Sequence, residues 1–269
     1  MAYFKSDNKD IYYESYGNGE PLILLNGIMM STESWQIFKE SLSKKCKLIL
    51  IDFLDQGKSD KMENLYTQDA QVEVLESLRK HLKLDNFNLL GISYGGEVAL
   101  KYTLKYQKNI KSLILSNTTA YTDPQLKQIG DSWIDAAKTH NGKIFFNASI
   151  PPVYSKSFFE KNAEWLIKRQ GYFEKAFKDE WYEAFIRLVK SAENYDVRDK
   201  INEIMVNTLL ISADDDGITP LKSQEYIYNK LPNCIWVTLN NCGHASMYEQ
   251  PLAFATTVLG FVENNEIKF

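Results

Sequence analysis

The segment Leu89-Leu90-Gly91-Ile92-Ser93-Tyr94-Gly95-Gly96 is the most informative part of this sequence for its fold. Residues 86–90 form an apolar run typical of a buried strand, and residues 97–102 have the pattern of a beginning helix. The sequence G-x-S-x-G-G between them predicts a tight strand-to-helix turn that lifts its serine above the edge of a sheet. Glycines suit this turn because a Cβ would clash with nearby backbone, and Ser93 itself is expected to be strained. The competing interpretation is a loop serine that caps the helix.

Apolar runs alternate with helical patterns along most of the chain. The predicted strands are 2–5, 10–16, 21–25, 47–51, 86–90, 110–116, 208–212 and 234–239. The predicted helices of this part are 34–43, 71–84, 97–106, 197–204, 220–231 and 251–263. Continuous apolar strands that alternate with helices are typical of parallel βαβ units. We therefore predict an α/β fold with a mostly parallel, eight-stranded sheet and helices on both faces.

The alternation stops at about residue 119 and resumes near residue 195. Residues 121–195 show helical patterns without a buried strand, and they carry 15 of the 35 aromatic residues. We expect residues 1–119 and 196–269 to form the core and residues 120–195 to form an inserted helical lid. Its aromatic side chains indicate either a largely apolar, medium-sized substrate or only the lid's own small core.

Composition and charge exclude several function classes. The 31 basic and 35 acidic residues give a net charge of −4, which argues against nucleic acid or an anionic membrane as a main partner. We find no secretory signal and no apolar stretch long enough for a membrane helix. Cys46, Cys234 and Cys242 show no metal-binding spacing and are expected to be free thiols, which favours the cytoplasm. The sequence does not indicate an oligomeric state.

A nucleophilic serine needs a base, and the chain has three histidines. His81 lies in a polar helix segment and His140 in a predicted turn of the lid, so both are expected at the surface. His244 follows the last predicted strand, where a parallel sheet presents its carboxyl edge. We predict that His244 is the base; the alternative is an ordinary loop histidine.

An acid that orients the base should also follow a strand. Asp214, Asp215 and Asp216 all follow the strand at 208–212. We favour Asp216, because it directly precedes Gly-Ile-Thr-Pro and lies closest to the turn into the next helix. The alternative is that all three merely cap the helix that begins at Pro220.

The chain from about residue 10 to residue 263 resembles the α/β-hydrolase superfamily, specifically its cap-bearing serine hydrolases. The order Ser93, Asp216, His244 is the family's order of nucleophile, acid and base. Residues 216–220 (D-G-I-T-P) are similar to the family's acid turn, and Gly243-His244 with Glu249 and Pro251 to its base loop. A serine at position 93 excludes the members that use an aspartate nucleophile.

The resemblance also concerns the oxyanion hole, the pair of N–H groups that would stabilise a negatively charged oxygen. Tyr94 opens the helix after the serine, so its N–H is a spare donor. The resemblance assigns the second donor to the N–H of Ile28. Asn26 stands where the family has histidine, and Leu54 and Asp55 stand where it has arginine and glycine. Asn26 can still hold the loop by hydrogen bonds. Asp55 is expected either to face the substrate or to be solvated.

The resemblance implies acyl transfer to water, with no metal and no cofactor. We expect cleavage of a carboxylic ester, thioester or lactone of a small to medium, largely apolar small-molecule substrate. The same fold and residues also serve C–C bond hydrolysis and other non-ester chemistry, and no local motif separates these activities. A further alternative is a hydrolase-like receptor that binds a small apolar ligand under its lid.

Overall fold

The computed structural model describes residues 2–264. Its strands are β1 (Ala2–Ser6), β2 (Lys9–Tyr16), β3 (Glu20–Leu25), β4 (Cys46–Ile51), β5 (Phe87–Ile92), β6 (Ile110–Ser116), β7 (Thr208–Ala213) and β8 (Cys234–Leu239). They form one eight-stranded sheet in the order β1-β2-β4-β3-β5-β6-β7-β8. The pairings β1–β2 and β2–β4 are antiparallel, and the remaining five are parallel. The predicted α/β fold with a mostly parallel sheet is confirmed.

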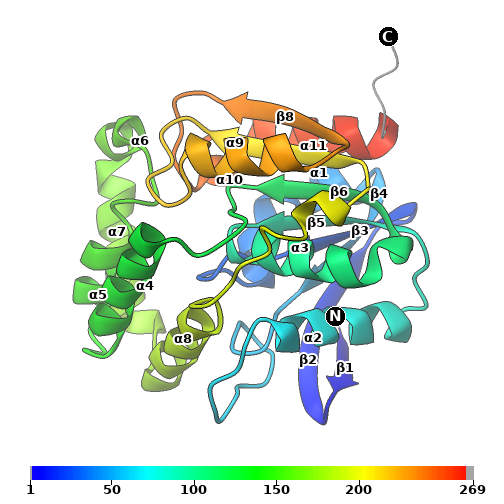
Figure 1. The fold of residues 1–269 in the computed structure, drawn as a ribbon. Helices are drawn as coiled ribbons and strands as arrows, with labels where there is room; N and C mark the ends of the chain where they lie inside the picture. The colour runs from blue at the N-terminus through cyan, green and yellow to red at the C-terminus, as the bar shows by residue number, and fades with distance from the viewer. Residues whose placement is uncertain (1, 265–269) are drawn as a thin grey trace.

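Helices cover both faces of this sheet (Figure 1). On one face lie α1 (Gln36–Ser43) and α11 (Pro251–Asn264), and on the other lie α2 (Asp69–His81), α3 (Tyr94–Tyr106) and α9 (Leu221–Lys230). Alternate residues of β3 serve the two sides: Leu22 and Leu24 belong to one core, Ile23 and Leu25 to the other. All four are fully buried, which explains why this strand is a continuous apolar run.

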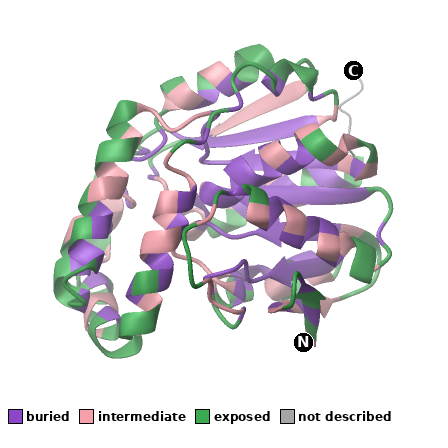
Figure 2. Ribbon diagram, turned by 60° about the horizontal axis from the view of Figure 1, so that its bottom comes forward, coloured by how far each residue is buried: buried purple, intermediate pink, exposed green. Residues whose placement is uncertain are grey.

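Five helices lie between β6 and β7 in the chain, and we call them the helical insertion. They are α4 (Pro124–Ala137), α5 (Gly142–Ser149), α6 (Lys156–Lys161), α7 (Ala163–Ala176) and α8 (Asp179–Ser191). Figure 1 shows this insertion beside the sheet, at the end to which the arrowheads of β6 and β8 point. Its outward turns are exposed, while its buried residues face inward (Figure 2).

The helical insertion has an apolar core of its own, and aromatic rings dominate it. The rings of Phe145 and Phe185 meet edge to face with centroids 4.9 Å apart, and Phe177 stacks on Trp181 at 3.7 Å. Much of the aromatic content of residues 121–195 is therefore explained by packing within the insertion. Some of the same rings also line a cavity, as described below.

One predicted helix is wrong. Residues 197–204 contain only the short 3₁₀ turn η3 (Ile201–Glu203). The segment begins in extended backbone, because the N–H of Val197 donates to the carbonyl of Ala120 and Asp196 pairs with Tyr121 in an isolated bridge. Ile201 and Ile204 are then fully buried in the core beside α3 and α9, so tertiary contacts outweigh helical spacing here.

The remaining short elements are η1 (Thr32–Trp35), η2 (Gln107–Asn109) and α10 (Ser246–Glu249). Across residues 2–264, no helix combines the length and the apolar character that crossing a bilayer requires.

Candidate active site

Ser93 lies in the turn between β5 and α3, in a backbone conformation that few residues adopt. Its φ is 52° and its ψ is −120°. A Cβ on Gly91 would lie 2.2 Å from the carbonyl oxygen of Gly95, and a Cβ on Gly95 would lie 2.5 Å from that of Leu25. Both glycines are therefore required by close backbone contacts, as the motif predicts. The turn places the Ser93 side chain at the carboxyl edge of the sheet.

Three side chains from separate loops meet at this edge. His244 Nε2 lies 2.9 Å from Ser93 Oγ, and His244 Nδ1 lies 3.0 and 2.9 Å from the two carboxylate oxygens of Asp216. Ser93 follows β5, Asp216 follows β7 and His244 follows β8. Because Asp216 faces Nδ1, it can hold the proton there and leave Nε2 free to accept the hydroxyl proton of Ser93.

The carboxylate of Asp216 is completely buried and fully hydrogen-bonded. One oxygen accepts the N–H groups of Ile218 and Thr219, each at 2.8 Å. The other accepts the Thr219 hydroxyl and the amide of Asn117, each at 2.9 Å. Burial alone would raise the pKa of Asp216, but the adjacent His244 ring and these donors hold the pKa below its usual range. Asp216 is therefore ionised at neutral pH.

The other candidates lie elsewhere. Asp214 and Asp215 are exposed, and each accepts one long backbone hydrogen bond, from Cys242 at 3.4 Å and from Lys156 at 3.3 Å. His81 is exposed and lies 3.3 Å from the hydroxyl of Tyr13. His140 is exposed in the helical insertion, 2.9 Å from Asp179.

The two expected oxyanion donors lie beside Ser93. Tyr94 is the first residue of α3, and Ile28 lines the same cavities as Ser93. Within residues 2–264 neither the Tyr94 nor the Ile28 backbone N–H donates a hydrogen bond to another protein atom. Both are thus available to a ligand.

Asn26 holds the loop that carries Ile28. Its carbonyl oxygen accepts the indole N–H of Trp35 at 2.7 Å, and its amide donates to the carbonyl of Ile51 at 2.8 Å. The amide also contacts Gln56, whose own amide donates to the carbonyl of Gly27 at 2.9 Å. The asparagine that replaces the family's histidine is therefore a structural link, fully buried and away from solvent.

Asp55 is neither solvated nor unpaired. Its carboxylate is completely buried and accepts hydrogen bonds from the Arg187 guanidinium. Arg187 Nε lies 3.1 and 3.2 Å from the two carboxylate oxygens, and Arg187 Nη2 lies 2.7 Å from one of them. Because Arg187 belongs to α8, this ion pair links the helical insertion to the loop after β4. Arginine at position 187 could not be selected from the sequence, since nothing local marks it.

Asn117 was also missed by sequence reasoning. It directly follows β6, is fully buried, and its carbonyl oxygen accepts the hydroxyls of Ser116 and Ser246 while its amide donates to Asp216. Its φ of 45° is one that asparagine tolerates better than most residues. A polar residue at the carboxyl end of a buried strand was the only available signal.

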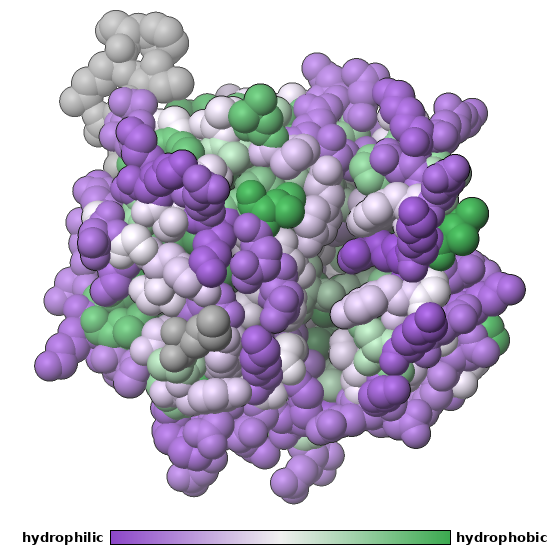
Figure 3. Space-filling view, turned by 180° about the vertical axis from the view of Figure 1, so that it is seen from behind, coloured by the Kyte–Doolittle hydropathy of each residue, from purple (hydrophilic) through white to green (hydrophobic). Residues whose placement is uncertain are grey.

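Two cavities open beside Ser93. The larger has a volume of about 650 Å³ and lies between the loops after β3 and β4 and the helical insertion; Ser93 and His244 both line it. Figure 3 shows the molecule hollowed between its two parts, with a floor less hydrophilic than the rim. A volume of this size accommodates a small to medium ligand.

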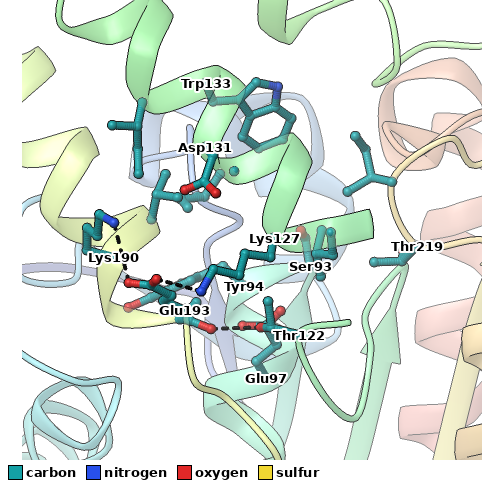
Figure 4. A pocket seen from close by; sticks show the side chains of 17 residues that line it. Ser93, Tyr94, Glu97, Thr122, Lys127, Asp131, Trp133, Lys190, Glu193 and Thr219 are labelled. Atoms are coloured by element: carbon teal, nitrogen blue, oxygen red, sulfur yellow. Dashed lines mark hydrogen bonds and ion pairs between the residues drawn. The ribbon is translucent and has the colours of Figure 1, made fainter. Parts of the chain in front are cut away.

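The smaller cavity has a volume of about 70 Å³ and lies where α4 and α8 approach α3. The carboxylate of Glu193 forms ion pairs with Lys127 and Lys190 (Figure 4). The distances from the carboxylate to the two Nζ atoms are 2.9 and 3.4 Å. Deeper inside, Glu97 is buried, and its carboxyl group accepts a hydrogen bond from the amide of Gln68 at 2.5 Å. Burial raises the pKa of Glu97 to about 8, so its carboxyl group is protonated at neutral pH.

We expect Glu97→Gln to stabilise the protein increasingly as pH rises from 5 to 8. The pKa of Glu97 is higher in the folded state than in the unfolded state. The contribution of Glu97 to the free energy of unfolding is therefore fully present below about pH 4.5, and it is lost as pH rises towards 8, because ionisation favours the unfolded chain. Glutamine is neutral in both states and has no such loss. The Tm difference between the variant and the wild type should grow by about 5 °C or more over this range. The exposed Glu225→Gln is the matched control, and a difference that stays constant with pH would contradict the prediction.

Metal ligands do not gather at this edge: among residues 2–264, no group of three or more His, Cys, Asp or Glu side chains is placed to hold a metal ion.

Comparisons with known proteins identify the family and the fold of this chain. A family profile described as alpha/beta hydrolase fold matches residues 20–251. The chain is 27% identical over 252 residues to a proline iminopeptidase of Lactobacillus delbrueckii subsp. lactis, covering 86% of this chain and 85% of that protein. A crystal structure of an alpha/beta hydrolase enzyme from a Medee basin deep-sea metagenome library is 42% identical with a TM-score of 0.97, covering 100% and 99% of the two chains. The enol-lactonase of Burkholderia xenovorans LB400 is similar in fold alone, with 20% identity, a TM-score of 0.87 and coverage of 98% and 100%.

Proposed function

Because this chain belongs to the α/β-hydrolase family and is a hydrolase, we propose that it cleaves carboxylic esters, thioesters or lactones through an acyl-enzyme on Ser93. The observation that carries the proposal is the hydrogen-bonded series Ser93, His244, Asp216, whose serine faces a cavity of about 650 Å³. A serine with a base, an orienting acid and an adjacent binding space has what acyl transfer needs.

The proposed reaction has two steps. Ser93 Oγ attacks the carbonyl carbon while His244 Nε2 takes its proton and then passes it to the leaving alcohol or thiol. Asp216 holds the other side of the imidazole and stabilises its charged form. His244 then takes a proton from water, which attacks the acyl carbon, and passes this proton to Ser93 Oγ as the ester bond to the enzyme breaks, which releases the acid and free Ser93. The backbone N–H groups of Tyr94 and Ile28 would stabilise the oxyanion in both steps, each by about 3 kcal/mol.

The helical insertion would act as a lid over this reaction. It supplies one wall of the larger cavity through residues such as Trp133 and Phe185. Its ion pair from Arg187 to Asp55 fixes α8 to the core near the cavity. We propose that residues 120–195 form the substrate-selecting cap and that residues 1–119 and 196–269 form the catalytic core.

An aminopeptidase activity is the second candidate, because the curated relatives named proline iminopeptidase match along 86% of the chain. Such an enzyme must hold the positively charged amino terminus of a peptide, which calls for an unpaired carboxylate in the cavity. The carboxylates that line the larger cavity are Glu33 and Asp55, and each has a cationic partner: Lys58 at 3.2 Å and Arg187 at 2.7 Å. Within the larger cavity, this charge arrangement favours ester over peptide substrates.

A panel of chromogenic substrates tests the proposal. 4-Nitrophenyl esters of rising chain length and simple lactones are compared with proline 4-nitroanilide and a vinylogous diketone, the last as a C–C bond substrate. We expect turnover of esters or lactones with a kcat/KM at least about 100-fold above that of the anilide. Preferential turnover of the anilide would favour a peptidase. Preferential turnover of the diketone would favour a C–C bond hydrolase. No turnover and no labelling of Ser93 by a fluorophosphonate would favour a receptor.

A further inference from the structure

Arg169 lies in the larger cavity as a cation with no ionic partner. It belongs to α7 and lines the same cavity as Ser93 and His244. Within residues 2–264 its guanidinium forms no hydrogen bond and no ion pair, and its Nε is buried without a hydrogen-bond partner. An arginine side chain is always charged and has five N–H donors, so leaving it unpaired in a partly enclosed space is costly.

Two aromatic rings lie close to this guanidinium. Its central carbon lies 5.2 Å from the ring centre of Trp165 and 5.8 Å from that of Phe173. Cation–π contacts of this kind stabilise the charge without using its N–H groups, which stay free for a ligand. Tyr154 lines the same cavity: burial raises the pKa of Tyr154 to about 12, and the charge of Arg169 acts in the opposite direction.

The other unsatisfied group of the same cavity is also a donor. The indole Nε1 of Trp133 is buried without a hydrogen-bond partner. Acceptors without a partner among residues 2–264, such as Gln68 Oε1 and Gln224 Oε1, do not line this cavity. Its two carboxylates, Glu33 and Asp55, are paired with Lys58 and Arg187. The cavity therefore offers one free positive charge and free donors to a ligand.

We propose that Arg169 binds a carboxylate of the substrate, so that the natural substrate is an ester or lactone that also carries an ionised carboxyl group. The planar N–H edge of arginine matches a carboxylate through two parallel hydrogen bonds. A single unpaired guanidinium balances the single charge of a carboxylate, whereas a phosphate monoester would bring a second charge without a partner. This inference rests on the proposed acyl transfer at Ser93 and adds a recognition site to it.

The test compares charged and neutral substrates of equal length. Mono(4-nitrophenyl) succinate, glutarate and adipate are each measured beside the corresponding methyl 4-nitrophenyl diester, in which the carboxylate is masked. For the best chain length we expect the ratio of kcat/KM, anionic over neutral, to fall by about 10- to 100-fold in Arg169→Met. Arg169→Lys keeps the charge but loses the two-point contact, so its ratio should lie between those of the wild type and Arg169→Met.

Lys168→Met is the matched control, because Lys168 is the exposed neighbour on the same helix and does not line the cavity. Its ratio should equal that of the wild type. A ratio that is the same in the wild type and in Arg169→Met at every chain length would overturn the proposal. Circular dichroism and Tm show whether each variant is folded. If Arg169→Met does not fold, the substrate ratio of Arg169→Lys provides the test instead.

A binding measurement separates this proposal from the proposed function. If no ester is hydrolysed, acyl transfer fails, but carboxylate recognition can still be tested with monomethyl glutarate by calorimetry on Ser93→Ala. Binding that weakens at least about tenfold when Arg169→Met is added supports the anion site by itself. Equal binding to both proteins, or no binding to either, overturns it.

Discussion

Ser93→Ala is expected to lower kcat on a 4-nitrophenyl ester by about 10⁵- to 10⁶-fold without changing the fold. The lost hydroxyl is the group that lies 2.9 Å from His244 Nε2 and that would carry the acyl chain. Only the oxyanion donors and the binding cavity would remain, and these alone give slow turnover. Alanine keeps the Cβ of serine, so the strained φ of 52° costs the same in both proteins. We expect the Tm to stay within about 2 °C.

The control for this variant is Ser41→Ala, an exposed serine of α1 that lines neither cavity. A fluorophosphonate should label the wild type and Ser41→Ala at one serine and leave Ser93→Ala unlabelled. Residual activity above about 1% in Ser93→Ala, after titration has excluded a contaminating enzyme, would indicate another nucleophile.

The strands that position this site were predictable because a buried strand requires a run of apolar residues, which is visible in the sequence. A strand that is covered on both faces, such as β3 with four consecutive fully buried residues, must be apolar throughout. The elbow was predictable for a similar reason, since the close contacts of Gly91 and Gly95 leave no room for a side chain. In both cases the constraint is local, so the sequence shows it directly.

Contacts between distant segments were not predictable. The sequence around Asp55 is compatible with a residue facing either the substrate or the solvent, because its partner Arg187 lies 132 positions away. No local pattern distinguishes Arg169 or Asn117, because their significance depends on what the fold brings near them: aromatic rings near Arg169, and Asp216 near Asn117. The wrong helix at 197–204 has the same origin, since a backbone hydrogen bond to Ala120 decides the start of that segment.

The choice among three consecutive aspartates is where local and tertiary evidence meet. In the sequence, Asp216 is distinguished by its place before a sharp turn. In the structure that turn supplies two backbone donors to its carboxylate, from Ile218 and Thr219. Asp214 and Asp215 each accept one hydrogen bond longer than 3.2 Å. The three residues are thus chemically identical in sequence and very different in environment.

Asp216→Asn is accordingly expected to lower kcat by about 10⁴-fold. The new amide can keep its oxygen towards the N–H groups of Ile218 and Thr219, but its NH₂ then faces His244 Nδ1 and the donating amide of Asn117. His244 must accept at Nδ1 and carry its proton on Nε2, which faces Ser93 and can no longer take the hydroxyl proton.

The controls for this variant are Asp214→Asn and Asp215→Asn, and we expect each to keep kcat within about threefold of the wild type, because both side chains are exposed. Steady-state kinetics on one ester, with Tm values to show that all three variants are folded, provide the measurement. A large loss of kcat in Asp214→Asn or Asp215→Asn, with Asp216→Asn close to the wild type, would move the role of the acid to the other residue and leave Ser93 and His244 in place.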